Sequence, residues 1–127
     1  AREVMQKAIV TIDGMATAKE AAAKMKKKKT FCLLVNKRHP DDAWGIVVVQ
    51  DLVKGVIISG RSPEDVHVYE IMTKPIITVP ADMDIRYAVR LLVRFRLTRA
   101  LVIDASRTPV GLATLRDMAL CQIETND

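Results

Sequence analysis

An internal repeat is the feature that most constrains the fold of this chain. Three hydrophobic segments of the first half recur with a constant spacing of 67 residues, and a glycine and an aspartate recur with a spacing of 66 residues. The matched pairs are Val4-Met5 with Ile71-Met72, Val10-Thr11-Ile12 with Ile77-Thr78-Val79, Leu33-Leu34-Val35 with Ala100-Leu101-Val102, Gly45 with Gly111, and Asp51 with Asp117. Because nearly one spacing relates segments along the whole chain, we predict two tandem copies of one structural unit. The copies cover residues 1–60 and 68–127, and residues 61–67 form a turn-rich linker between them.

Each copy has the pattern of a short extended segment, a helix, two strands and a closing helix. The first helix starts with the capping box Thr17-Ala18-Lys19-Glu20, and Asp84 is the natural N-cap of its counterpart in the second copy. The spacing of apolar residues predicts one buried face on each helix. These faces consist of Ala18, Ala22 and Met25 in the first helix, and of Ile85, Val89, Leu92 and Phe95 in the second.

Short apolar runs bounded by turn residues predict two buried strands in each copy. These runs are Phe31–Val35 and Gly45–Val49 in the first copy, and Ala100–Ile103 and Val110–Ala113 in the second. The order of elements predicts an α/β (α+β) fold of two pseudo-symmetric β-α-β-β-α copies packed sheet to sheet, in which each copy covers the apolar sheet face of the other.

The composition describes one compact domain. The 127 residues are 50% hydrophobic and carry a formal net charge of +5, which suffices for a core without a disulfide or a metal. Cys32 and Cys121 form no CxxC or Cys/His pattern, so we expect two free thiols and no metal site. No apolar run approaches the roughly 18 residues of a membrane span, and the first residues lack the order of a signal peptide. We therefore expect a cytoplasmic protein without a membrane span.

The segment Gly111-Leu112-Ala113-Thr114-Leu115-Arg116-Asp117 leads from a predicted strand into the last helix. Thr114 stands at the N-cap and Asp117 at N3, a common capping arrangement that stabilises a helix by about 1 kcal/mol and requires no ligand. The same helix start offers a hydroxyl and backbone N–H groups to an anion, and the carboxylate beside it suits the hydroxyls of a ribose. Taken alone, these seven residues favour the capping interpretation.

The repeat changes this balance, because the motif occurs in a tandem with hydrophobic-x-Thr strands, a capped amphipathic helix and a basic residue before an apolar strand. In this order and spacing, the chain resembles a pair of cystathionine-β-synthase (CBS) domains, the Bateman module, from about Arg2 to Leu120. The segment Thr98-Arg99-Ala100-Leu101-Val102-Ile103-Asp104 occupies the place where the family usually has Ser/His-Arg-Leu-Pro-Val-Val-Asp. Leu101 replaces the usual proline, a departure that removes no ligand group.

The resemblance implies that an adenosine derivative binds in a cleft between the halves, most often AMP, ADP or ATP and sometimes S-adenosylmethionine. Carried over by position, Asp117 would hold the ribose hydroxyls, Thr114 a phosphate oxygen, and Arg99 the phosphate charge, for which a guanidinium fork is well suited. The backbone expected at the adenine edge is that of Ile76, Ile77 and Thr78.

The first copy departs from this pattern at two positions. Val48 stands where the second copy has Thr114, and Cys32 stands where it has Arg99. A valine cannot hydrogen-bond a phosphate, and a neutral thiol does not replace a guanidinium. We therefore predict two unequal clefts, of which the one in the first copy is weak, empty or suited to a less charged ligand. Its residues are Asp51, Thr11 and Val10.

A basic stripe on the second helix raises a different interpretation. Arg86, Arg90 and Arg94 follow one another at intervals of four residues, and the sequence pI is about 9.4, so a nucleic acid, an acidic partner or a polyphosphate has to be considered. Five aromatic residues leave few platforms for stacking bases, and no nucleic-acid-binding motif is present. We do not expect nucleic acid to be the main partner.

The sequence contains no Ser/His/Asp or Cys/His constellation, no convincing pair of carboxylates, and no P-loop or dinucleotide fingerprint. We therefore expect a protein that is not an enzyme and needs no cofactor, but that binds an adenine nucleotide as a regulatory ligand. The resemblance implies a homodimer formed through the helices and a regulated enzyme or transporter as partner. The alternatives are a structural or interaction module with vestigial clefts, and a module that binds S-adenosylmethionine or nucleic acid.

Overall fold

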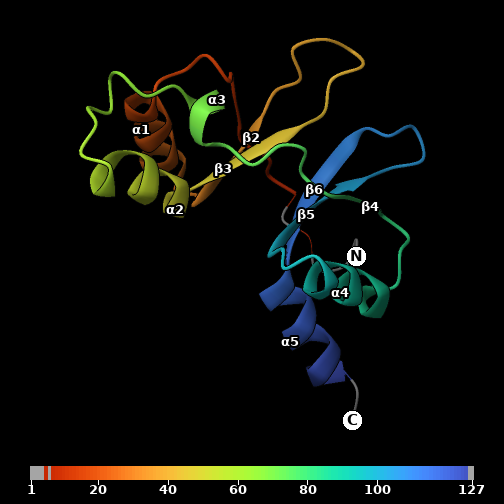
Figure 1. Cartoon of the computed structure of the whole chain (residues 1–127). Coiled ribbons are helices and arrows are strands. Elements are labelled where there is room, and N and C mark those ends of the chain that lie inside the picture. The colour runs from red at the N-terminus through yellow and green to blue at the C-terminus, as the bar shows by residue number, and fades with distance from the viewer. Residues whose placement is uncertain (1–4, 6, 126–127) are drawn as a thin grey trace. The chain divides into compact units, whose positions relative to one another are not determined.

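The computed structural model describes residue 5 and residues 7–125, and the chain divides into two compact units (Figure 1). The continuous unit is Val10–Ile76, and the discontinuous unit combines Ala1–Ile9 with Ile77–Asp127. The boundaries of the two units differ from those of the sequence repeats, because in each copy the segment before the first strand belongs to the other unit. Val68 is fully buried in the core of the continuous unit, and Met5 packs against the core of the discontinuous unit. Val4, which the repeat pairs with Ile71, lies outside the described residues.

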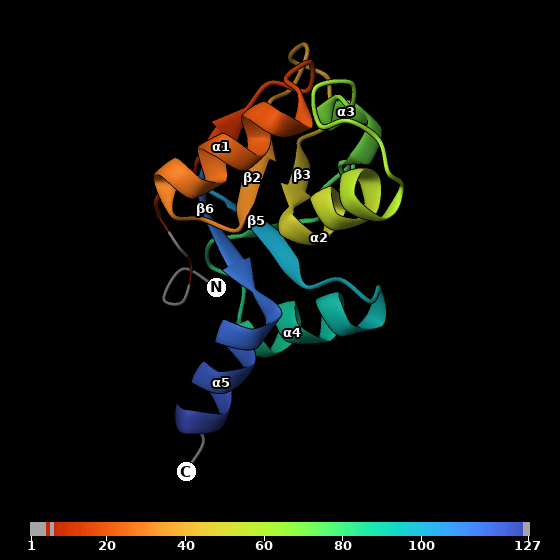
Figure 2. The same ribbon diagram turned by 90° about the vertical axis from the view of Figure 1, so that its left-hand side faces the viewer.

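The continuous unit is built on a three-stranded sheet of order β1-β2-β3. Its elements are β1 (Thr11–Ile12), α1 (Ala18–Lys28), β2 (Cys32–Val35), β3 (Gly45–Val48), α2 (Val49–Leu52), the π-helix η2 (Val53–Ile58) and α3 (Val68–Ile71). Strand β1 is parallel to β2, and β2 is antiparallel to β3. Helix α1 packs on this sheet (Figure 2), because Ala21 and Met25 share a core with Leu33, Val35 and Val47.

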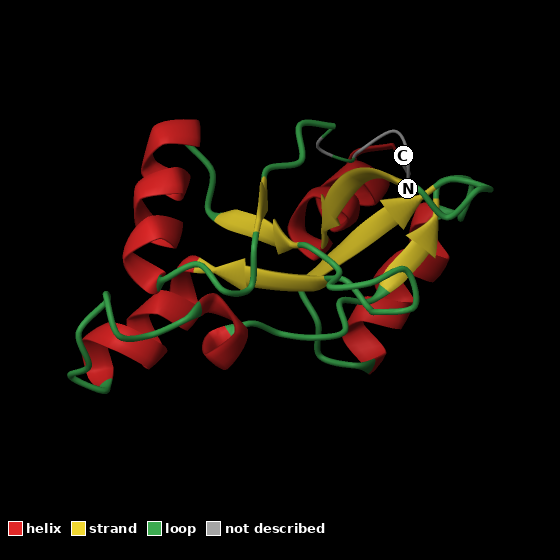
Figure 3. Cartoon of the chain, turned by 90° about the horizontal axis from the view of Figure 1, so that it is seen from above, coloured by secondary structure: helices red, strands yellow, loops and turns green. Residues whose placement is uncertain are grey.

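The discontinuous unit repeats this architecture with a sheet of order β4-β5-β6. Its elements are β4 (Thr78–Pro80), α4 (Ile85–Arg94), β5 (Arg99–Ile103), β6 (Pro109–Thr114) and α5 (Leu115–Thr125), seen by type in Figure 3. Strand β4 is parallel to β5, and β5 is antiparallel to β6. Ala88 and Leu92 of α4 and Met118 of α5 are fully buried with Val102 and Ala113 of the sheet.

The strands of the two sheets pair in the same register, so residues that the sequence repeat matches have matching partners. Thr11 pairs with Leu34 in the first sheet, and Thr78 pairs with Leu101 in the second. The antiparallel pairs correspond in the same way: Cys32 with Val48 and Arg99 with Thr114, Val35 with Gly45 and Val102 with Gly111. The predicted fold class, a mixed α/β chain of two related copies, is confirmed.

The helix starts agree with the sequence. The Thr17 hydroxyl accepts a hydrogen bond from the Glu20 N–H (3.2 Å) and donates one to the Glu20 carboxylate (3.3 Å). Asp84 accepts a bond from the Arg86 N–H at 2.8 Å, and the Arg86 guanidinium holds the pKa of this carboxyl below its usual value. A charged carboxylate at the first turn stabilises the helix through its macrodipole.

Both helices also end in the same way. Lys29 (φ 54°) and Arg96 (φ 56°) adopt the left-handed conformation directly beyond the helical turns. In each case the next N–H reaches back five residues, from Thr30 to the Met25 carbonyl (3.0 Å) and from Leu97 to the Leu92 carbonyl (2.8 Å). These bonds define a Schellman motif at each end.

Three local expectations were wrong. On α1 the buried alanine is Ala21 and Ala22 is exposed, because the core follows the spacing i, i+3, i+7 from Ala18. Phe95 lies beyond the last turn of α4 and is exposed. Val49, expected as the end of a strand, begins α2, the predicted closing helix, which continues as a π-helix.

The π-helix passes close to α3. A Cβ added to Gly55 would clash with Cγ2 of Ile71, so this approach requires glycine. Among residues 5 and 7–125, no helix is long and apolar enough to cross a lipid bilayer.

Candidate functional site

The strand–helix junction of the discontinuous unit brings together Arg99, Thr114 and Asp117. Arg99 opens β5 and Thr114 closes β6, and the two residues are direct partners in the antiparallel ladder. Directly opposed residues project their side chains to the same face of a sheet. The guanidinium and the hydroxyl, 15 positions apart in sequence, therefore belong to one face at one end of the sheet.

Thr114 also starts helix α5. Its Oγ1 accepts a hydrogen bond from the Asp117 N–H at 3.1 Å, and the Leu115 N–H donates to the Thr98 carbonyl at 2.8 Å. The first bond is the predicted N-cap. It fixes the hydroxyl at the positive end of an 11-residue helix, where a negatively charged ligand is favoured.

The two charged groups at this junction are held only loosely by the protein. The Asp117 side chain is 35% exposed, and its Oδ1 lies 3.6 Å from Nε of the exposed Arg116. Arg99 is half-buried, and its Nη1 lies 3.5 Å from Thr98 Oγ1, at the limit of a hydrogen bond. Surface contacts of this kind contribute little stability. Both groups therefore remain able to turn toward a ligand.

The residues expected at the adenine edge fall in two different units. Thr78 is an exposed residue of β4, and the Ile77 carbonyl beside it accepts a bond from the Leu101 N–H at 2.9 Å. These two residues thus belong to the same sheet as Arg99. Ile76 is buried in the continuous unit, where its N–H donates to the Trp44 carbonyl at 2.9 Å.

The equivalent junction of the continuous unit has the same backbone with different side chains. Cys32 lies opposite Val48, and the Val49 N–H donates to the Phe31 carbonyl at 3.1 Å. Val48 has no hydroxyl to accept the Asp51 N–H, and the Asp51 carboxylate accepts a different bond, from the Val48 N–H at 2.8 Å. Asp51 thus caps the short helix α2 itself. Thr11 and Val10 lie on the β1 side of this sheet, where the Val10 carbonyl accepts a bond from the Leu34 N–H at 2.9 Å.

The fold and these two related junctions agree with the comparison to known families. A model of the CBS domain matches residues 1–57 and 68–123, and the chain therefore belongs to the CBS domain family, with two copies of the domain in tandem. The resemblance inferred from the sequence is confirmed. CBS domains are in general regulatory or binding modules.

Two sequence relatives come from archaea. An uncharacterized protein of Methanopyrus kandleri is 32% identical over 117 residues, which are 91% of this chain and 59% of that protein. An uncharacterized protein of Methanocaldococcus jannaschii is 24% identical over 116 residues, 91% of this chain and 61% of that protein. The chain thus spans about three fifths of the length of these relatives.

Solved structures match over nearly the whole chain. The hexameric CBS-CP12 protein from bloom-forming cyanobacteria is 36% identical with a TM-score of 0.90, covering 100% of this chain and 74% of that one. The CBS domain of a bacterial CNNM/CorC family Mg²⁺ transporter, solved in complex with ATP, is 26% identical with a TM-score of 0.76, covering 93% and 82%. The first similarity shows a CBS pair in an oligomer, and the second a CBS module that holds a nucleotide.

The sequence did not indicate a second group of polar residues, which lies in the continuous unit. Arg38, Asp42 and Lys74 meet beside a cavity, although Asp42 and Lys74 are 32 positions apart. The segment around Arg38 and Asp42 has the composition of an ordinary polar turn. Only the packing of the segment after α3 against this turn brings Lys74 to it, and no local pattern encodes that contact.

Proposed function

We propose that this protein is a regulatory module that binds an adenine nucleotide (AMP, ADP or ATP) through the Arg99–Thr114–Asp117 junction. The observation that carries the proposal is the direct cross-strand pairing of Arg99 with Thr114, whose hydroxyl is fixed by the Asp117 N–H. In this proposal the guanidinium of Arg99, the hydroxyl of Thr114 and the carboxylate of Asp117 converge on a ligand at the start of α5.

Each of these groups has a chemical role that suits it. The Arg99 guanidinium offers paired donors to phosphate oxygens, and the Thr114 hydroxyl and the first N–H groups of α5 add further donors. The Asp117 carboxylate accepts hydrogen bonds from the two ribose hydroxyls. The backbone of Ile77 and Thr78 would meet the polar edge of the adenine.

The ATP complex of the CNNM/CorC CBS domain supports a nucleotide as the ligand class. The family membership supports a regulatory role, in which the ligand stabilises one arrangement of the protein over another. A ligand shifts such an equilibrium only by the difference between its affinities for the two states. We expect self-association, at least to a homodimer, to take part in this response, and an enzyme or transporter to be the regulated partner.

Isothermal titration calorimetry with AMP, ADP, ATP and S-adenosylmethionine tests the proposal. We expect at least one adenine nucleotide to bind, and Asp117→Ala and Arg99→Gln each to weaken it by tenfold or more. Glu124→Ala, which removes an exposed carboxylate from the same helix, is the matched control and leaves the affinity unchanged.

The alternatives give different results in the same experiment. A module with vestigial clefts binds none of the four compounds, and tighter binding of S-adenosylmethionine than of any nucleotide replaces the proposed ligand. A further titration uses a short RNA: salt-sensitive binding of the RNA that survives Asp117→Ala, without binding of any nucleotide, assigns the basic surface to nucleic acid. Each of these results contradicts the nucleotide proposal.

A further inference from the structure

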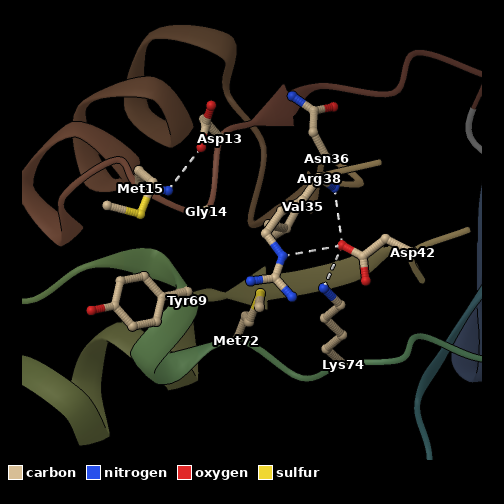
Figure 4. A pocket seen from close by; sticks show the side chains of 10 residues that line it. All are labelled: Asp13, Gly14, Met15, Val35, Asn36, Arg38, Asp42, Tyr69, Met72 and Lys74. Atoms are coloured by element: carbon tan, nitrogen blue, oxygen red, sulfur yellow. Dashed lines mark hydrogen bonds and ion pairs between the residues drawn. The ribbon is translucent and has the colours of Figure 1, made fainter. Parts of the chain in front are cut away.

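The continuous unit contains a cavity of about 420 Å³ at the end of its sheet where β2 turns into β3 (Figure 4). This volume is within the range of pockets that bind small molecules. Three segments line it: the loop after β1, the start of the β2–β3 hairpin loop, and the chain around and after α3. These segments are separate in the sequence, and the fold of the continuous unit brings them together around the cavity.

One polar wall of the cavity is fixed by Asp42, whose side chain is only 10% exposed. Its Oδ2 accepts hydrogen bonds from Lys74 Nζ (2.7 Å) and from the Arg38 N–H (2.9 Å), and lies 3.5 Å from Arg38 Nε. The ammonium of Lys74 and the backbone N–H groups of Arg38 and Ala43 hold the pKa of Asp42 far below its usual value. The carboxylate is thus charged at neutral pH, and its charge offsets that of Lys74.

Arg38 is the group that remains for a ligand. It contacts Asp42 through its backbone N–H and Nε, and its side chain is 79% exposed. In Figure 4 the dashed lines join Arg38 to Asp42 through its backbone N–H and Nε, and none joins the terminal nitrogens Nη1 and Nη2 to another of the side chains drawn. An arginine oriented by a carboxylate on one edge presents its other edge as a paired donor for an oxyanion.

The opposite wall is apolar and unusually exposed. Tyr69 is 51% and Met15 is 68% exposed, and both line the cavity together with Met72 and Val35. The Tyr69 ring is held in place by stacking on His67, with ring centroids 5.6 Å apart. A rigid aromatic ring beside a methionine is a suitable surface for a flat apolar group.

The charges at the cavity select the kind of oxyanion. Asp13 and Asp42 balance Arg38 and Lys74, so the lining has no net charge. Asp13 is directed to its own loop, where Oδ1 accepts a bond from the Met15 N–H at 2.8 Å. A monocarboxylate adds one negative charge to this neutral lining and a phosphate dianion adds two, so the repulsion from Asp13 and Asp42 is weaker for the monocarboxylate.

We propose that this cavity binds a small monocarboxylate that carries an aromatic or other flat apolar group. The carboxylate pairs with Nη1 and Nη2 of Arg38, and the apolar group lies against Tyr69 and Met15.

The discontinuous unit provides an internal comparison. A hollow of about 390 Å³ occupies the equivalent place, beside Pro80–Asp82 and Ile103–Ala105, and its lining contains two carboxylates and no cation. One of them, Asp104, already accepts bonds from the Ser106 and Thr108 N–H groups at 2.9 Å. The proposed ligand is therefore specific to the continuous unit.

The proposed site is also separate from the nucleotide chemistry. Within the continuous unit, Cys32, Val48 and Asp51 mark the junction end of strands β2 and β3, and Val35 and Gly45 mark the hairpin end where the cavity lies. The inference thus goes beyond the proposed function and does not depend on it.

Two-dimensional ¹H–¹⁵N NMR of the full chain tests the proposal with three probes that share a phenyl ring: benzoate, benzamide and phenyl phosphate. We expect benzoate to shift the amide signals of residues 13–15, 36–42 and 69–74 in a saturable way. Benzamide, which lacks the charge, and phenyl phosphate, which carries a second charge, bind at least tenfold more weakly.

Variants locate the site and separate it from the nucleotide site. Arg38→Gln, at an exposed position, should weaken benzoate binding at least tenfold, whereas Arg107→Gln in the hairpin of the other unit and Asp117→Ala should leave it unchanged. No saturable shifts with benzoate, shifts elsewhere in the chain, equal binding of benzamide or phenyl phosphate, or an unchanged affinity of Arg38→Gln would each overturn the proposal.

Discussion

Thr114 and Val48 occupy the same place in their sheets, and the difference between them is a hydroxyl against a methyl group. In the discontinuous unit the hydroxyl caps the helix, and the Asp117 carboxylate is left for other partners. In the continuous unit the aspartate accepts the Val48 N–H itself. The acid thus caps the helix with its carboxylate at one junction, and at the other the threonine hydroxyl forms the cap.

Thr114→Val should therefore have two separate effects. Loss of the cap lowers the free energy of unfolding by about 1 kcal/mol, and loss of the hydroxyl weakens the nucleotide. Urea denaturation measures the first effect and calorimetry the second. Thr114→Ser, which keeps the hydroxyl, should recover most of both; a Ser variant that behaves like the Val variant contradicts the role given to the hydroxyl.

Asp42 makes stability depend on pH in acid. Its pKa is lowered in the folded protein from an ordinary value of 3.8, so below about pH 4 the unfolded chain binds a proton that the folded chain does not. The stability that this carboxylate contributes is present above pH 4 and is lost as the pH falls further. Asp42→Asn should be less stable than the wild type at pH 7, and the difference should shrink toward pH 2. Urea denaturation at several pH values measures this, and a constant difference would argue against the ion pair.

The roles of individual residues could be predicted from the sequence where the interaction joins residues that are close in the chain. Thr17, Asp84 and Thr114 were predicted as caps because a cap joins residues two or three positions apart. The contact between Asp42 and Lys74 joins two loops and left no pattern in the sequence.

At the scale of elements, the two helix ends give a test that needs no ligand. Lys29 and Arg96 hold a left-handed conformation, which costs a residue with a side chain about 1 kcal/mol and costs glycine nothing sterically. Lys29→Gly and Arg96→Gly should each raise the free energy of unfolding, by less than 1 kcal/mol because glycine also gains entropy in the unfolded chain.

Lys27→Gly is the matched control, since Lys27 is an exposed lysine within α1. It should lower the free energy of unfolding by about 0.5–1 kcal/mol. Guanidinium denaturation of the three variants gives these values. If the two C-terminal glycines destabilise the protein as Lys27→Gly does, the Schellman motifs do not form in solution.

A helix or strand could be predicted from the sequence where its own residues carry a pattern of caps, turns or apolar positions. The helices α1 and α4 and the four longer strands follow from caps, turns and apolar runs. The π-helix after α2 does not, because its course depends on how closely Gly55 approaches Ile71, a contact with another element. Ala21 is buried in place of Ala22 for a similar reason: two neighbouring alanines leave the sequence without a preference, and packing on the sheet decides.

For the whole molecule, the unequal junctions predict the binding stoichiometry. The wild type should bind one nucleotide per chain tightly, because only one junction has the guanidinium and the hydroxyl. The double variant Cys32→Arg/Val48→Thr restores both groups to the continuous unit and should add a second binding event in calorimetry. Two equal sites in the wild type would contradict the asymmetry, as would a double variant that still binds one.

At this scale the sequence predicted the repeat and the family, because both depend on spacing along the whole chain. It did not predict that the compact units exchange their leading segments. The repeat matches residues of one copy to residues of the other. It gives no information on which unit the short segment before each first strand packs against.

This exchange has a consequence for synthesis. A ribosome synthesises residues 10–76 as one uninterrupted stretch, so the continuous unit has all its parts before residues 77–125 are made. Met5 is made before this unit, but the core that it packs against includes Met118, which is made after it. The discontinuous unit can therefore complete its core only after the whole of the continuous unit has been synthesised.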